Sequence, residues 1–419
     1  MARRIGVGFV GSGFIAQFHA RSWTGVRDGD IVAVTSRTRE SAESFANLSR
    51  QLGVGEPAVC DNVTELVRLP EVDAVWITAP NYERLPIIEA IVEEVKRGRS
   101  KVRAVAIEKP LARNVKEAER LIELVESVEL LHGYLENQVF TPSLVRGKEI
   151  AWVRGAGIAG PPYLARAAEE HSGPHRPWFW RGPLQGGGVL SDMMCHSVEA
   201  GRFLLTPPDN PDFLRPVAVT ATIGSLKWSK TPYADRLRQE SNGEVDYVKA
   251  PAEDYANAEI VYETANGDLV IAQANTSWSY VGPGLRLTFE LLGPEYSLSV
   301  NTLDPDSRIF FSRNIVGPTG EDLVEKQAAE QGHMPYLGDE AHAYGYTHEN
   351  QHMATAFARG EMPRETLHDG LLVSKLLMAA YKSAELGETI KFPPEGLSEF
   401  VPLVQQDKWH PRQLVERAK

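Results

Sequence analysis

Two side chains with the chemistry of a general base, Asp192 and His196, stand four residues apart after three glycines at 186–188. The stretch predicts a helix capped by Ser191, and positions i and i+4 of a helix share one face. A carboxylate beside an imidazole holds the ring in one tautomer and raises its basicity. The alternative is structural, with Asp192 interacting with the helix dipole and His196 packed in a core.

A single lysine, Lys109, stands in the sequence Glu108-Lys109-Pro110 at the end of a predicted buried strand, 102–107. Proline restricts the residue before it and can follow a cis peptide bond, so this corner is expected to be rigid. The end of a buried strand is an unusual place for a solvated charge, so Lys109 is a candidate for chemistry. The alternative is a surface lysine paired with Glu108.

Aromatic and polar residues are interleaved from His171 to Trp180. Carbohydrates present apolar faces and hydroxyl edges, and such a mixture suits both. His171 and Trp178 are therefore candidate substrate contacts. The alternative is a packed loop with ordinary aromatic residues.

The residues from His348 to His352 fit H-E-x-x-H, in which two histidines bind zinc and the glutamate acts as a base. Only three positions of this pattern are fixed, and no H-x-x-G-x-x-H extension follows. We therefore predict no metal centre, although His333 and His342 nearby leave an incidental or structural metal site open.

A glycine-rich turn at residues 11–16 fits the pattern G-x-G-x-x-A of dinucleotide sites. Gly11 permits a tight turn out of the preceding strand, and Gly13 lets a pyrophosphate approach bare backbone. The phosphates then lie on the free N–H groups at the start of the following helix, which begins with Phe14 and Ile15. The alternative is a turn with a purely structural role.

The type of cofactor depends on the end of the second predicted strand, 31–35, which runs into Ser36 and Arg37. NAD sites carry an acidic residue about here. A serine and an arginine suit a 2′-phosphate instead, so NADP is favoured over NAD. The alternative is that Arg37 stacks on the adenine or points to solvent.

Strands and helices alternate through the N-terminal part of the chain. Further strands are predicted at 72–78 and 102–107, with helices at 41–52, 85–97 and 115–128. This spacing indicates βαβ units and a parallel sheet. In such sheets ligands bind beyond the carboxyl ends of the strands. The residues that follow those ends are Ala79, Pro80, Asn81, Glu108 and Lys109.

Past residue 133 the pattern changes to successive strands, predicted at 162–169, 216–225, 258–263, 268–278, 286–292 and 296–301. Asn266-Gly267 and Gly293-Pro294 are turn signals between them. Residues 227–256 are polar and predicted to form a long loop, and helices at 347–359 and 371–386 follow.

These elements predict an α/β protein with two domains. The first, 1–133, is a Rossmann dinucleotide-binding domain. The second, 134–419, is an α+β domain for substrate binding and oligomerisation, with a large, mostly antiparallel open sheet.

The length, net charge and cysteine count of the chain limit its possible partners and location. The chain has 419 residues and a net charge of −12, which argues against nucleic acid or an anionic membrane as the main partner. Two cysteines, Cys60 and Cys195, exclude a disulfide framework and suit a reducing compartment. We find no signal peptide and no apolar run long enough to span a membrane, so a cytoplasmic location is expected.

Four motifs in this order and spacing resemble the glucose–fructose oxidoreductase/inositol dehydrogenase (Gfo/Idh/MocA) family. They are residues 11–16, Thr78-Ala79-Pro80-Asn81, Glu108-Lys109-Pro110 and Asp192-Met193-Met194-Cys195-His196. Members of the family are mostly NAD(P)-dependent dehydrogenases of sugars, inositols and related polyols, and often dimers or tetramers. The resemblance implies that Lys109, Asp192 and His196 match the family's lysine, aspartate and histidine, and that the chain forms a homodimer or homotetramer.

The chain departs from the family pattern in two places. Tyr82-Glu83-Arg84 stands where the family often has a histidine, and Gln138 replaces a basic residue in the stretch 134–140. Substrate contacts are therefore not carried over from either stretch.

The reading that joins these features is a dehydrogenase acting on a secondary hydroxyl of a sugar or cyclitol. His196 takes the hydroxyl proton, Lys109 stabilises the developing alkoxide, and Asp192 orients the substrate or His196. Two alternatives remain open. One is an enzyme that cleaves glycosides by transient oxidation and elimination with a retained NAD, and the other is a non-catalytic sensor of cofactor or sugar.

Overall fold

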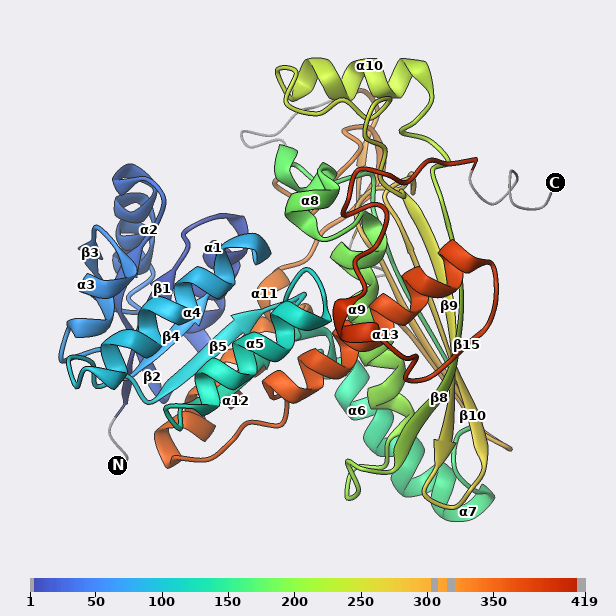
Figure 1. Cartoon of the computed structure of the whole chain (residues 1–419), viewed down its shortest axis with the longest axis horizontal. Helices are drawn as coiled ribbons and strands as arrows, with labels where there is room; N and C mark the ends of the chain where they lie inside the picture. Colours follow the sequence, from blue (N-terminus) through green and yellow to red (C-terminus); the bar gives the residue numbers. More distant parts are fainter. Residues whose placement is uncertain (1–3, 303–307, 315–320, 413–419) are drawn as a thin grey trace. The chain divides into compact units, whose positions relative to one another are not determined.

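The computed structural model describes residues 4–302, 308–314 and 321–412 (Figure 1). The chain divides into two compact units, Met1–Pro142 with Ala341–Leu372, and Ser143–Glu340 with Val373–Lys419. The prediction placed everything after residue 133, and therefore 341–372, in the second domain. The structure groups this segment with the N-terminal unit because helix α12 (Tyr346–Arg359) packs against helix α1 (Phe14–Ser22).

The first unit is built on a six-stranded parallel sheet in the order β3-β2-β1-β4-β5-β6. Its strands are β1 (Ile5–Val10), β2 (Gly29–Thr35), β3 (Ala58–Cys60), β4 (Ala74–Ile77), β5 (Ala104–Glu108) and β6 (Leu131–Leu135). This is the strand order of the Rossmann fold, so the predicted fold of this part is confirmed. Every residue of β1, β4 and β5 is buried, as expected for central strands covered on both faces.

Helices cover this parallel sheet (Figure 1). Besides α1 and α12 they are α2 (Arg39–Gln51), α3 (Val63–Arg68), α4 (Asn81–Lys96) and α5 (Val115–Glu126), with short 3₁₀ turns at Trp23–Gly25 and Asn137–Phe140. Side-chain caps decide where three of them begin: Thr38, Asn62 and Asn114 each accept a hydrogen bond from a backbone N–H in the first turn.

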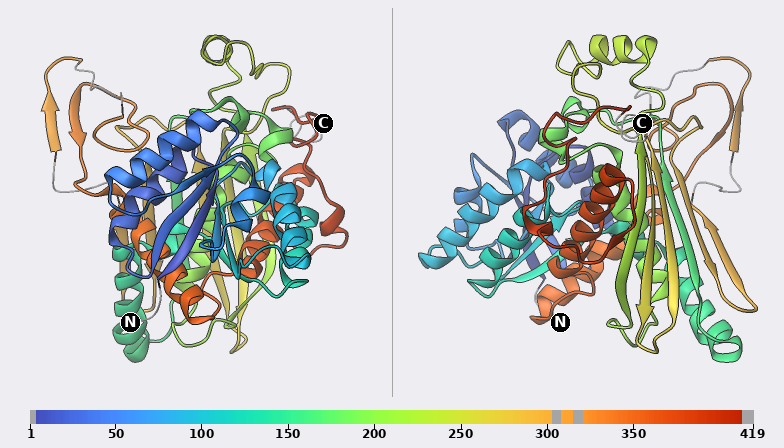
Figure 2. Two further views of the ribbon diagram at one scale, coloured as in Figure 1. Left: turned by 90° about the vertical axis from the view of Figure 1, so that its left-hand side faces the viewer. Right: turned by 45° about the vertical axis from the view of Figure 1, so that its right-hand side comes forward.

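The second unit is built on a seven-stranded sheet in the order β12-β11-β7-β10-β9-β8-β15. Its strands are β7 (Leu164–Glu170), β8 (Leu214–Gly224), β9 (Tyr255–Thr264), β10 (Leu269–Ser277), β11 (Arg286–Leu292), β12 (Ser297–Asn301) and β15 (Ile390–Lys391). Only β7 and β10 pair in parallel, so the predicted antiparallel character is confirmed. A separate hairpin joins β13 (Arg308–Phe311) to β14 (Gly332–Pro335) and stands away from this sheet in Figure 2.

Helix α9 (Val189–Leu205) packs against β7 and β10, and all but one of its residues are buried. The other helices of this part are α6 (Pro142–Ile150), a π-helical turn at Ala151–Ala156, α7 (Gly157–Ala159), α8 (Gly182–Gln185) and α10 (Thr231–Glu240). Helix α11 (Glu340–Ala343) and helix α13 (Leu367–Leu386) begin in one unit and end in the other, and 3₁₀ turns lie at Pro177–Trp180 and Leu397–Glu399. Within the described ranges, no helix combines the length and apolar composition needed to cross a bilayer.

Two local predictions were wrong. Residues 227–256 are not a continuous loop, because they contain helix α10. The sequence did not reveal this helix, because its only buried side chains, Ala234 and Leu237, are too few to show a helical period. Ser191 does not cap α9, which begins at Val189 after Gly188. The short elements β3, α3 and β6 were not predicted, since three to six residues carry little periodicity.

The start of α9 is held by a buried carboxyl group. Glu253 Oε1 accepts hydrogen bonds from the N–H groups of Gly188 and Leu190, at 2.9 and 3.0 Å, and from the hydroxyl of Tyr381 at 2.5 Å. Burial raises the pKa of Glu253 to about 7 from the usual 4.5, against the opposing effect of these donors. Glu253 is thus protonated over much of the range below neutrality.

This raised pKa predicts a stability that falls with pH. The folded chain holds a proton that the unfolded chain releases above about pH 4.5, so stability from this group is lost as the pH rises toward 7. The loss amounts to about 3 kcal/mol of unfolding free energy by about pH 8. Glu253→Gln keeps the accepting oxygen but cannot ionise, so we expect it to remove most of this loss in denaturant titrations at about pH 5 and about pH 8.

The matched control is Glu240→Gln, which removes the same charge from an exposed position on α10. It should unfold with the pH dependence of the unsubstituted chain. Equal pH slopes for Glu253→Gln and the unsubstituted chain would contradict the assignment.

Candidate active site

The turn between β1 and α1 is shaped to admit a phosphate. Gly11 has φ +106°, and an added Cβ there would lie 2.8 Å from Ala79 N and from Thr78 Oγ1. At Gly13, which precedes α1, an added Cβ would meet nothing within 4 Å. The first turn of α1 carries no acidic residue. The free N–H groups and positive end of this helix therefore fit the pyrophosphate of a dinucleotide.

The other predicted cofactor residues of this region surround that turn. Phe14 and Ile15 open α1, and the Phe14 side chain is 42% exposed. The Ser12 hydroxyl donates to Ser36 Oγ, 2.8 Å away, and so joins the turn to the residue after β2. Arg37 is exposed. These positions are compatible with both NAD and NADP, and the contact of Arg37 with a 2′-phosphate stays a prediction.

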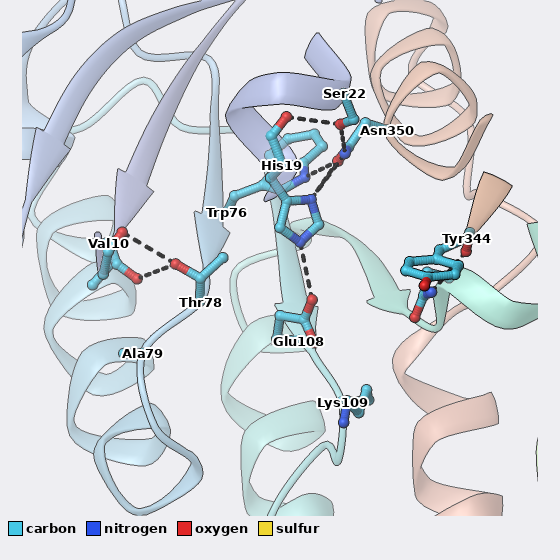
Figure 3. Close-up of polar contacts among 12 residues, drawn as sticks. Val10, His19, Ser22, Trp76, Thr78, Ala79, Glu108, Lys109, Tyr344 and Asn350 are labelled. Carbon is cyan, nitrogen blue, oxygen red and sulfur yellow. Dashed lines mark hydrogen bonds and ion pairs between the residues drawn. The ribbon is translucent and has the colours of Figure 1, made fainter. Parts of the chain in front are cut away.

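The chain passes from β4 into α4 through Thr78, Ala79, Pro80 and Asn81. The Thr78 hydroxyl lies 3.1 Å from the carbonyl oxygen of Gly11, and Figure 3 shows it turned toward the end of β1. Asn81 is the first residue of α4 and is 3% exposed. The helix thus begins four residues before the predicted start at 85, and this brings Asn81 to the carboxyl edge of the sheet.

Strand β5 ends in a buried carboxylate followed by a half-buried lysine, drawn in Figure 3. Glu108 is 4% exposed, and its Oε1 lies 2.9 Å from Nε2 of His19. Burial by itself raises the pKa of Glu108, but the hydrogen bond and charge of His19, with the charges of Lys109 and Arg84, bring that pKa below its usual value. Glu108 is therefore an acceptor, so His19 Nε2 carries the proton and donates it.

His19 is held from the other side by Asn350, a fully buried residue of α12. The Asn350 amide nitrogen lies 2.8 Å from Nδ1 of His19 and donates to the hydroxyl of Ser22 at 2.7 Å. Its oxygen accepts a hydrogen bond from the indole of Trp76 at 2.8 Å. Figure 3 shows this chain of contacts running from β4 through α12 and α1 to the residue before Lys109.

The second group of predicted residues lies on α9. Asp192 and His196 are 4% and 3% exposed. Asp192 Oδ2 accepts a hydrogen bond from the indole of Trp278, 3.3 Å away, and His196 Nε2 lies 3.7 Å from Glu169 Oε2 of β7. A buried imidazole beside a carboxylate is suited to take up a proton, because the carboxylate stabilises the resulting cation. Sequence reasoning did not single out Glu169, the carboxylate that lies 3.7 Å from Nε2.

The stretch from His171 to Trp180 is mostly packed. His171 is 3% exposed, and its Nδ1 accepts the backbone N–H of Gly173 at 2.9 Å. Trp180 is buried among other aromatic rings, whereas Trp178 is half-buried and stacks on Phe179 with ring centroids 3.8 Å apart. Sugar contacts by His171 and Trp178 stay predictions.

The H-E-x-x-H stretch lies on α12 and has structural partners. His352 Nε2 accepts the backbone N–H of Arg364 at 2.8 Å, which occupies one of the two ring nitrogens that could bind a metal. Glu349 is fully buried, and burial raises its pKa well above the usual value, with a further contribution from Glu108, Glu136 and Glu365. A neutral, buried glutamic acid is unsuited to act as a peptidase base.

Another cluster of potential ligands lies at Glu126, His132 and His368. His132 Nδ1 accepts the backbone N–H of Leu367 at 3.1 Å, so the neutral ring carries its proton on Nε2. That nitrogen faces Glu126 Oε1 at 3.8 Å, and His368 Nε2 lies 2.7 Å from the same oxygen. The arrangement is that of two histidines beside a carboxylate rather than of a ligand set with free lone pairs.

The structure thus brings the predicted residues together in two groups. The first unit gathers the predicted cofactor residues and Lys109 at the carboxyl edge of its sheet, and the second holds Asp192 and His196 on one helix. Sequence reasoning missed the partners of these residues: His19, Asn350, Glu169, Trp278 and Glu253. His19 lies three residues after the glycine motif, but its partners come from distant segments, so no local signal identifies them.

Known proteins match both units. The description "Oxidoreductase family, NAD-binding Rossmann fold" matches residues 5–133, and "GFO/IDH/MocA C-terminal domain" matches residues 152–299. Together the two matches cover about two thirds of the chain.

Curated relatives match about half of the chain or more. The uncharacterized protein YMR315W of Saccharomyces cerevisiae is 30% identical over 203 residues, which are 46% of this chain and 53% of that protein. The 1,5-anhydro-D-fructose reductase of Ensifer adhaerens is 26% identical over 52% of this chain and 61% of its own length. The inositol 2-dehydrogenase of Rhizobium meliloti is 22% identical over 65% and 69%. The chain therefore spans little more than half of the first two relatives.

Among solved structures, GenD2 from gentamicin A biosynthesis, in complex with NAD, is 25% identical. It covers 94% of this chain and 97% of its own, with a TM-score of 0.74. Levoglucosan dehydrogenase in complex with NADH has a TM-score of 0.66 at 20% identity and shares the fold. With both family descriptions matched on a Rossmann unit and a mostly antiparallel unit, the chain belongs to the GFO/IDH/MocA family of oxidoreductases with an NAD-binding Rossmann fold.

Proposed function

We propose that this chain is an NAD(P)-dependent oxidoreductase that interconverts a secondary hydroxyl and a ketone on a sugar, sugar derivative or cyclitol. The observation that carries the proposal is the bare helix start at Gly13, in a chain that also places Lys109 at the end of β5 of the same sheet. Relatives named as an anhydrofructose reductase and an inositol dehydrogenase support this substrate class. We further propose that 1–133 binds the cofactor and that substrate binding and oligomerisation belong to 134–419, apart from 341–372, which the structure groups with the first unit.

In this proposal a dinucleotide held at the turn of residues 11–16 would supply hydride-transfer chemistry, and residues of the chain bind the substrate and move its proton. His196 takes the proton of the substrate hydroxyl, and Glu169, 3.7 Å from its Nε2, stabilises the imidazolium that results. Lys109 donates a hydrogen bond to the substrate oxygen as negative charge develops there. Asp192, held by Trp278, orients the substrate or His196, and His171 and Trp178 are further contacts of the substrate.

The proposal also includes the preferred cofactor, the oligomeric state and the location of the protein. We propose NADP as the preferred cofactor because Ser36 and Arg37 follow β2 where NAD sites carry an acidic residue. A homodimer or homotetramer in the cytoplasm, with no nucleic-acid or membrane partner, completes the proposal.

Gly13→Ala tests the cofactor site without disturbing the fold. An added methyl group meets no protein atom, and the residue's φ of −71° suits alanine, so thermal stability should be unchanged. The methyl group occupies the path of the pyrophosphate, so we expect the Kd for NAD(P) to rise at least ~10-fold by fluorescence titration. Gly338→Ala, at another open position, is the control and should bind normally. Unchanged binding in Gly13→Ala would refute the site.

Arg37→Ala tests the cofactor preference. Removing the guanidinium should weaken NADP binding at least ~10-fold and leave NAD binding nearly unchanged, because only NADP carries the 2′-phosphate. The control is Arg39→Ala, which removes a neighbouring exposed arginine that pairs with Glu43 and Asp61. Equal losses for both cofactors would assign Arg37 to the adenine instead.

Lys109→Ala and His196→Ala test the chemistry. Each should lower kcat at least ~10²-fold on a substrate found by a sugar and cyclitol screen, while the Kd for cofactor stays near that of the unsubstituted chain. Lys101→Ala removes an exposed lysine of the same unit and should keep full activity. Full turnover in either variant would overturn its role. A purified protein that retains its cofactor and cleaves glycosides without net NAD(P) reduction would instead establish the glycoside-cleaving alternative.

A further inference from the structure

A buried arginine, Arg84, gathers the backbone carbonyl groups around Lys109. It lies on α4 and is 4% exposed. Its Nε donates to the carbonyl of Ala79 at 3.1 Å and its Nη2 to the carbonyl of Lys109 at 3.2 Å. Its Nη1 donates to the carbonyls of Glu108 and Pro110.

These four carbonyl groups belong to two chain segments at the carboxyl edge of the parallel sheet. Ala79 follows β4, and the other three lie at the end of β5 and in the corner that follows it. The guanidinium is a planar fork with five donors, so it can hold several acceptors in one geometry, whereas a lysine ammonium cannot reproduce that fork. Arg84 therefore fixes the main chain of Lys109 relative to the segment that follows β4.

The charge of Arg84 also acts on a side chain next to Lys109. Its positive charge contributes to lowering the pKa of Glu108, the residue before Lys109. A buried cation is tolerated when its donors are satisfied and an opposite charge is near, and both conditions hold here. The same side chain thus fixes the backbone at Lys109 and helps to keep the neighbouring carboxylate ionised.

We propose that Arg84 is a positioning residue for catalysis. Its hydrogen bonds to the backbone carbonyl groups around Lys109 fix the position of that residue. Arg84 does not itself touch substrate in this proposal. The inference rests on the proposed dehydrogenase function, in which Lys109 must meet a developing alkoxide, and a misplacement of about 1 Å of such a group can cost much of the rate.

The chain offers a matched control at the opposite edge of the same sheet. Arg4 donates to the carbonyls of Arg27 and Gly29, at 2.6 and 2.8 Å, near the amino end of β2. It is also an arginine that clasps backbone carbonyls, but none of them belongs to a predicted site residue. Arg4→Ala should therefore lower stability without changing turnover.

The first experiment measures kinetics in Arg84→Ala, Arg84→Lys and Arg4→Ala under conditions where each is folded by circular dichroism. We expect both Arg84 variants to lose at least ~10-fold in kcat with a smaller change in KM, and Arg4→Ala to lose neither. Millimolar guanidinium should restore part of the kcat of Arg84→Ala and leave Arg84→Lys and the unsubstituted chain unchanged. If Arg84→Ala does not fold, Arg84→Lys carries the comparison. Unsubstituted kcat in a folded Arg84 variant would overturn the proposal.

The second experiment needs no substrate and so separates this proposal from the proposed function. Hydrogen–deuterium exchange of a peptide spanning 104–113 should be at least ~10-fold faster in Arg84→Ala or Arg84→Lys than in the unsubstituted chain and Arg4→Ala. Unchanged exchange there would overturn the positioning role even if the enzyme is active. Faster exchange in a protein that binds no NAD(P) and turns over no sugar would show that Arg84 holds this backbone. It would at the same time overturn the proposed function and the catalytic role that Arg84 has within it.

Discussion

The hydrogen bond between His19 and Glu108 is the contact on which the cofactor edge of the first unit depends. It joins the helix that follows the glycine turn to the strand that delivers Lys109, and both side chains are buried. A buried carboxylate is costly unless it is hydrogen-bonded and faces positive charge, and Glu108 meets both conditions. Asn350 extends the contact to α12. A segment that follows the last strand of the sheet by more than two hundred residues in sequence therefore helps to fix the carboxyl edge of that sheet.

Each unit contains a buried ionisable side chain that organises main-chain polar groups. Arg84 collects carbonyl groups at the ends of β4 and β5, and Glu253 collects N–H groups at the start of α9. Strand ends and helix starts leave such groups without partners inside the fold, so a side chain with several donors or acceptors can satisfy them together. In both units the backbone held in this way carries residues proposed for chemistry.

Much of the architecture was predictable because its signals are local. Apolar strands alternating with helices indicate a parallel sheet, and Asn266-Gly267 marks the hairpin between β9 and β10. The glycine turn was predictable for the same reason, since Gly11 needs a positive φ and Gly13 needs open space. Helix α10 was missed because few apolar positions mark it, and Ser191 was taken for a cap because serine is a common capping residue, although Glu253 serves α9 instead.

The sequence by itself determined the parallel, dinucleotide-binding character of the first unit, the antiparallel character of the second and the identity of the motif residues, because each depends on short-range patterns of residue type. Only the tertiary structure decided that Glu108 pairs with His19, that Arg84 donates to the carbonyl of Lys109, and that Glu169 lies near Nε2 of His196. Those contacts join segments far apart in the chain, and their existence depends on packing geometry that no local pattern encodes.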